Sequence, residues 1–82
     1  MKTKLLLADD EAGIRKVLGI LLEDSGYDVV LAEDGKRALE IFRETVPAIV
    51  LTDIKMPGID GIALLKIIKE ENPAMVFIDV GG

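Results

Sequence analysis

Three aspartates are the residues of this sequence best suited to chemistry. Asp9 and Asp10 follow a short apolar run, and Asp53 follows a second apolar run further along the chain. Carboxylates brought close together repel one another unless a cation compensates their charge. A ligand set made only of oxygen atoms favours a hard cation, Mg²⁺ or Mn²⁺, over zinc. The three aspartates therefore form the candidate metal site.

Each aspartate also has a purely structural explanation. Asp10 is placed to cap the helix expected after it, with Asp9 solvated, and an Asp after a buried strand often caps the next helix. However, Asp53 is followed by a Met-Pro-Gly loop at 56–58, which keeps it out of an immediate helix. Two acidic positions at one edge of a sheet favour a functional site. The Asp-Gly pair at 34–35 is explained by turn and cap chemistry, and we assign it no function.

Length and composition exclude several other kinds of site. The chain has 82 residues and a formal net charge of −5, with no His, Cys or Trp. This length fits one small domain. The missing residue types exclude disulfides, thiolate or imidazole metal sites and Ser-His or Cys-His catalysis. The acidic balance argues against nucleic-acid binding by this chain.

Neither a membrane span nor a secretory segment is visible in the sequence. A bilayer span needs about 18 consecutive apolar residues, and no apolar run approaches that length. We expect a cytoplasmic protein without membrane contacts.

Apolar runs and helical periodicity alternate along the chain. Short apolar runs predict buried strands at 4–8, 28–32, 49–52 and from residue 75. Apolar residues at helical spacing predict helices from a cap at Asp10 to 25–26, from 35 to about Glu44, and from 60 or 61 to just before 72. The order β-α-β-α-β-α-β predicts the α/β class, with a parallel sheet and right-handed crossovers.

Parallel sheets bind ligands beyond the carboxyl ends of their strands. If the strands at 4–8 and 49–52 are neighbours, the three aspartates converge in one shallow pocket at that edge.

The same residues carry a resemblance to a known family. The chain resembles the receiver domain of bacterial two-component response regulators, which has a flavodoxin-like fold of the chemotaxis-receiver type. The matching segments are 6–11, 26–27, 32–35 and 51–61. The resemblance implies that residues 1–82 form one receiver domain, truncated after about strand four and lacking the family's fifth β-α unit.

The resemblance also implies roles for individual residues. Asp53 would accept a phosphoryl group from the phosphohistidine of a sensor histidine kinase or phosphotransfer domain. Asp10, Asp53 and the backbone carbonyl of Lys55 would hold Mg²⁺, with Mn²⁺ as a substitute, and Asp9 would act indirectly through water. Such a module is no enzyme, beyond slow self-phosphorylation and autodephosphorylation.

Part of the family pattern is missing from this sequence. The family's hydroxyl residue at the end of strand four aligns with Gly81, and its Lys after strand five has no counterpart. We therefore expect impaired phosphorylation. Asp79 interrupts an apolar strand, and we place it at a frayed end. The alternative function is a self-associating scaffold that keeps the acidic pocket but does not signal.

Two surfaces are candidates for protein partners. Truncation would leave strand four as an open edge beside the wide apolar face of the third helix, which predicts a homo-oligomer through these two elements. The first helix, around Ile14, Val17 and Leu18, resembles the family's kinase-docking surface, although these residues also suit a core-facing role.

Two enzyme classes fit the sequence poorly. Haloacid-dehalogenase-type phosphohydrolases need a second Asp two residues after the nucleophile, where this chain has Lys55. A dinucleotide-binding site needs a glycine-rich turn after the first strand, and residues 9–13 contain a single glycine.

Overall fold

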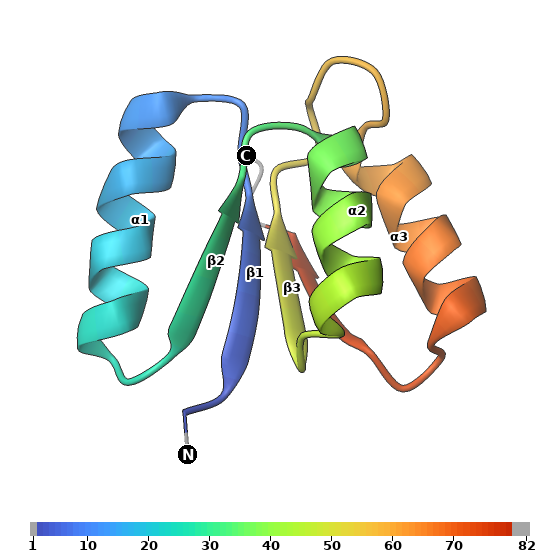
Figure 1. The fold of residues 1–82 in the computed structure, drawn as a ribbon. Coiled ribbons are helices and arrows are strands. Elements are labelled where there is room, and N and C mark those ends of the chain that lie inside the picture. The colour runs from blue at the N-terminus through green and yellow to red at the C-terminus, as the bar shows by residue number, and fades with distance from the viewer. Residues whose placement is uncertain (1, 80–82) are drawn as a thin grey trace.

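Four parallel strands form one sheet, and the helices that connect them lie on both of its faces (Figure 1). The structure is a computed structural model, and it describes residues 2–79. The elements are β1 (Lys4–Ala8), α1 (Ala12–Asp24), β2 (Asp28–Ala32), α2 (Gly35–Thr45), β3 (Ile49–Thr52), α3 (Gly61–Glu71) and β4 (Val76–Asp79). The strand order β2-β1-β3-β4 makes β1 and β3 the central pair. The predicted flavodoxin-like α/β fold is therefore confirmed.

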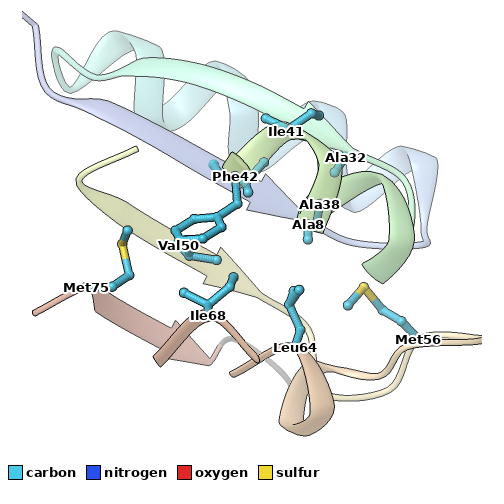
Figure 2. Packing of buried hydrophobic residues seen from close by; sticks show 11 residues of the cluster. Ala8, Ala32, Ala38, Ile41, Phe42, Val50, Met56, Leu64, Ile68 and Met75 are labelled. Atoms are coloured by element: carbon cyan, nitrogen blue, oxygen red, sulfur yellow. The ribbon is translucent and has the colours of Figure 1, made fainter. Parts of the chain in front are cut away.

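Alternating side chains of the central strands divide the core into two clusters. Leu6 and Ala8 face α2 and α3, whereas Leu5 and Leu7 face α1. The larger cluster contains Phe42 of α2 together with residues of α3 (Figure 2). This packing places α1 alone on one face and the other two helices on the opposite face (Figure 1).

Local sequence signals account for most of the element ends. Gly26 has a φ of 99°, a left-handed conformation that suits the turn after α1. Asp34 and Asp60 cap α2 and α3, each accepting a hydrogen bond of 2.8 Å from a backbone amide in the first turn. Among residues 2–79, no helix is both long and apolar enough to cross a bilayer.

The start of α1 differs from the prediction. Glu11, and not Asp10, occupies the N-cap position, and its side chain makes no capping bond. The reason is the side chain of Asp9, whose carboxylate accepts a hydrogen bond from the amide of Glu11. This bond holds the chain in a turn, so that the helix begins at Ala12. The prediction of Asp10 as a cap was therefore wrong.

The apolar face of α1 is buried only in part. Leu18 and Leu22 pack on the smaller core cluster, but Ile14, Val17 and Leu21 are exposed. The core-facing interpretation was therefore wrong for Ile14 and Val17. α2 and α3 pack on the opposite face of the sheet, so no other described helix lies beside α1 to cover these side chains (Figure 1).

The last strand, β4, differs from the prediction at both ends. It begins one residue later than predicted, and it includes Asp79, which we expected at a frayed end. Val76 is the first residue of β4, although Met75 before it is buried. Asp79 is the last residue of β4, exposed and in register with Thr52 of β3. Pairing with β3 therefore extends the strand to Asp79, although the run of apolar residues ends at Ile78. The predicted position of Gly81 lies outside the described residues.

An ion pair joins the two helices of the larger core. Arg43 of α2 donates three hydrogen bonds to the two carboxylate oxygens of Glu71 of α3, the shortest at 2.7 Å. These bonds lower the pKa of Glu71 from its ordinary value of 4.5 and raise the pKa of Arg43. The side chains of Arg43 and Glu71 are 56% and 37% exposed to solvent, so the stabilisation is small.

We predict an acid-dependent loss of this stabilisation. Because the pKa of Glu71 is lower in the folded state, its contribution is complete above the unfolded pKa and disappears as the pH falls through the folded pKa. The raised pKa of Arg43 matters only in strong alkali. Arg43→Gln should therefore unfold at a slightly lower temperature than the wild type at pH 7 and at the same temperature near pH 2, measured by circular dichroism. Lys36→Gln, on the same helix, is the control for charge loss, and equal effects of both variants at pH 7 would contradict the prediction.

Candidate acidic metal centre

Strand pairing places Asp9 and Asp53 next to each other at the carboxyl edge of the sheet. Ala8, the last residue of β1, is in register with Thr52, the last residue of β3, and an aspartate directly follows each strand. The amide of Asp53 donates a 3.0 Å hydrogen bond to the carbonyl of Ala8, and the amide of Asp9 donates one of 3.1 Å to Ala32 of β2. The main chain at both aspartates is thus fixed by the sheet.

Asp10 completes a cluster of three carboxylates. One carboxylate oxygen from each of Asp9, Asp10 and Asp53 lies within 4.8 Å of the others. Asp9 is 3% exposed, Asp53 is half-buried and Asp10 is exposed. The cluster therefore has a buried floor and an open side that faces solvent.

Asp9 is held by bonds at its main chain and at its side chain. Its Oδ1 accepts the Glu11 amide at 2.9 Å, and its carbonyl accepts a 2.7 Å bond from Nη1 of Arg15 on α1. A bond to a guanidinium is stronger than one between neutral groups. These contacts fix the turn that carries Asp10 toward the other two carboxylates.

The loop between β3 and α3 forms the other wall of the site. The amide of Lys55 donates a 3.3 Å bond to Oδ1 of Asp53. Met56 is buried in the larger core cluster, and Gly58 turns the chain with a φ of 74°. The loop that contains Lys55 is therefore anchored to the core just beyond the site.

Sequence reasoning missed two glycines that shape this wall. A Cβ atom on Gly61 would lie 2.5 Å from the carbonyl oxygen of Asp53, and one on Gly35 would lie 2.0 Å from that of Ile59. The Asp-Gly pair at 34–35 thus does more than turn the chain. The sequence does not indicate which backbone segment will pack against a given glycine, so neither contact could be predicted from local sequence.

The donor set suits a small hard cation. Oxygen ligands on opposite sides of one Mg²⁺ lie about 4.2 Å apart, since each metal–oxygen distance is about 2.1 Å. The spacing of at most 4.8 Å between the three aspartates is close to this value and leaves room for a bridging water at one of them. Asp9, Asp10 and Asp53 are thus brought together as the sequence predicted, and Lys55 lies in the adjoining loop.

The chain matches a family model along nearly its whole length. Residues 5–81 match the model described as "Response regulator receiver domain". Sporulation initiation phosphotransferase F of Bacillus subtilis is 38% identical over 84 residues, which cover all of this chain and 68% of that protein. The probable transcriptional regulator ycf27 of Guillardia theta is 40% identical over 77 residues, 94% of this chain and 30% of that protein. The chain thus spans about a third of the length of such regulators.

Solved structures show the same fold. A response regulator receiver domain protein of Clostridium thermocellum superposes with a TM-score of 0.91 at 37% identity, covering 94% of this chain and 63% of that one. The chemotaxis response regulator CheY4 of Vibrio cholerae gives a TM-score of 0.91 at 26% identity, covering 96% and 68%. The four strands and three helices are thus arranged as in these proteins.

We predict that the metal-free cluster destabilises the fold. Two like charges about 4 Å apart repel by about 1 kcal/mol even in bulk water. Asp10→Asn removes one charge from the exposed side of the cluster without changing side-chain size. In chelator, thermal unfolding monitored by circular dichroism should therefore show a higher midpoint for Asp10→Asn than for the wild type, with a smaller gain in 1 M salt.

Asp28→Asn is the matched control for this prediction. Asp28 is the exposed first residue of β2, so it lies at the amino ends of the strands, whereas the cluster lies at their carboxyl ends. An equal gain in both variants would reflect net charge alone and would contradict a local repulsion.

Proposed function

The chain belongs to the family of response regulator receiver domains, and we propose that its Asp53 accepts a phosphoryl group from the phosphohistidine of a sensor histidine kinase or phosphotransfer domain. The observation that supports this proposal is the cluster of Asp53 with Asp9 and Asp10 at the carboxyl edge of the sheet. Receiver domains are signalling modules, and we place this one, residues 1–82, in the cytoplasm.

Asp53 is the nucleophile in the proposed transfer. One of its carboxylate oxygens bonds to phosphorus while the phosphorus–nitrogen bond of the phosphohistidine breaks, and the imidazole leaves with that electron pair and takes up a proton. Within residues 2–79, the Lys55 amide donates to Oδ1 of the Asp53 carboxylate, and Oδ2 is the oxygen proposed to attack. Half-burial lets the donor reach it.

Asp10, Asp53 and the Lys55 carbonyl are the proposed ligands of Mg²⁺, with Mn²⁺ as a substitute and Asp9 acting through water. A bound Mg²⁺ would neutralise the charge that develops on the phosphoryl oxygens. The protein's own contribution is positioning, since the sheet ladder fixes Asp9 and Asp53 before any ion arrives.

We expect this transfer to be slow. The family resemblance includes a hydroxyl at the end of strand four, and the residue that aligns with it in this chain is Gly81, which has no side chain. Losing one donor that stabilises transition-state charge costs about 3 kcal/mol, roughly a hundredfold in rate.

Phosphorylation by a small donor tests the proposal. We predict that acetyl phosphate or phosphoramidate with Mg²⁺ adds the mass of one phosphoryl group to the intact chain, and that chelator prevents this. Asp53→Asn should abolish the adduct, because the amide nitrogen and oxygen are poor nucleophiles. Intact mass spectrometry during the incubation measures both results.

Asp60→Asn is the matched control. Asp60 lies in the same loop and caps α3 through its side-chain oxygen, which Asn retains. This variant should form the adduct at the wild-type rate. An adduct that survives in Asp53→Asn would refute Asp53 as the acceptor, and a wild-type chain that binds Mg²⁺ without forming an adduct would support the scaffold function.

We further propose that a second copy of this chain pairs along β4. β4 is an edge strand of the described sheet, and Val76 and Ile78 on its α1-facing side are 51% and 45% exposed. On the other side, a hollow of about 230 Å³ between α3 and β4 is lined by Ile62, Leu65 and Phe77, among others. An apolar edge with exposed ladder groups is a template for another strand.

A two-fold axis between the copies makes this pairing antiparallel. The same strand edge of each copy then meets that of the other, so the assembly closes at two chains.

We predict a dimer at micromolar concentration by sedimentation equilibrium. Ile78→Lys should give a monomer, because it places a charge on the apolar side of the edge. Ile20→Lys is the control, since Ile20 is an isoleucine on α1 that is exposed to a similar extent, 53% against 45% for Ile78. A wild-type monomer with cooperative unfolding at that concentration would disprove self-association.

A further inference from the structure

The N-terminus of α2 touches the β3–α3 loop at a residue without a side chain. Gly35, the first residue of α2, is buried, and a Cβ atom on it would lie 2.0 Å from the carbonyl oxygen and 2.8 Å from the Cβ of Ile59. These distances leave no room for even a methyl group. The backbones of the helix and of the loop are therefore in direct contact.

Any larger residue at this position has to displace backbone. Non-bonded heavy atoms rest about 3.5 Å apart, so the contact to the Ile59 oxygen would have to lengthen by about 1.5 Å. α2 is anchored by the buried side chains of Ala38, Ile41 and Phe42. The loop is held by fewer buried groups, and it is the part that moves.

Displacement at Ile59 reaches the acidic cluster through the closed shape of the loop. Ile59 precedes the cap residue Asp60, and the amide of Gly61 just beyond it donates a 2.8 Å bond to the carbonyl of Ile54. Ile54 lies between the two residues of this loop that are proposed to hold the ion, Asp53 and Lys55. Movement at one end of the loop therefore shifts the other end.

We propose that Gly35 is a positioning residue for the acidic metal centre. By letting the loop rest directly on α2, it sets the positions of the Lys55 main chain and of the Asp53 carboxylate, which the Lys55 amide contacts, relative to Asp9 and Asp10. This inference rests on the proposed function, because it takes Mg²⁺ as the ion. It gives the Asp-Gly pair at 34–35 a role in the site as well as in the turn.

Linkage makes the coupling reciprocal. If the Gly35–Ile59 contact favours Mg²⁺ binding, then Mg²⁺ binding must favour that contact by the same free energy. The start of α2, outside the carboxylate cluster, therefore responds to the state of the site.

Mg²⁺ affinity of the folded chain is the first test, measured by isothermal titration calorimetry below each variant's unfolding midpoint. Gly35→Ala should weaken binding about tenfold or more, the range found when a group that orients metal ligands is lost. Gly13→Ala is the matched control, because a Cβ there meets nothing within 4 Å. It should bind Mg²⁺ within about twofold of the wild type.

Ile59→Ala separates positioning from stability. It removes a half-buried side chain that packs on the larger core, and it leaves the backbone contact with Gly35 in place. We expect a lower unfolding temperature with nearly unchanged Mg²⁺ affinity. If Gly35→Ala, folded, binds Mg²⁺ as tightly as Ile59→Ala does, the inference is overturned.

The second test is the amide NMR spectrum of the wild-type chain. It tests the role of Gly35 even if Gly35→Ala does not fold. On Mg²⁺ addition, the amide resonance of Gly35 should shift together with that of Lys55, while that of Gly26, at the far end of α1, should stay in place. A stationary Gly35 resonance with a shifting Lys55 resonance overturns the inference alone. A wild-type chain that binds no Mg²⁺ overturns the proposed function and the inference with it.

Discussion

Parallel pairing of β1 with β3 is the constraint on which the site depends. The register of Ala8 with Thr52 makes the two strands end together, and the following residue on each is an aspartate. Main-chain hydrogen bonds to neighbouring strands hold both aspartates in place. The sheet therefore opposes the mutual repulsion of the carboxylates, and a cation that relieves this repulsion finds its ligands already positioned.

Close backbone packing is the second requirement of the site. Gly61 lets α3 begin against the carbonyl of Asp53, and Gly35 lets α2 begin against Ile59. Both contacts involve main-chain atoms, which cannot rotate away as a side chain does. The loop between β3 and α3 is thus braced by two helix starts, while Met56 ties it to the core.

Sequence patterns predicted individual elements where the deciding interaction was local, and the parallel order of those elements predicted which strand ends meet. Apolar runs gave the strand at 28–32 with the boundaries of β2, and the coincidence of acidic residues at strand ends gave Asp9, Asp10 and Asp53. Predictions failed where a distant or competing contact decided. The Asp9 carboxylate accepts a hydrogen bond from the Glu11 amide, and α1 therefore begins later than predicted. Pairing with β3 includes Asp79 in β4. The tight contact at Gly35 depends on Ile59, in a loop far along the chain.

Unequal burial on the two faces of the sheet separates the site from the apolar surface. Met56 connects the loop of the site to the larger cluster under α2 and α3, whereas the smaller cluster under α1 leaves Val17 and Leu21 exposed. A partner that covers the α1 face would bury apolar area and stabilise the fold. The β3–α3 loop would keep its contacts, because they lie on the opposite face. Association through α1 and ion binding at the aspartates would then contribute separately to stability, except through Asp9, whose carbonyl is bonded to Arg15 of α1.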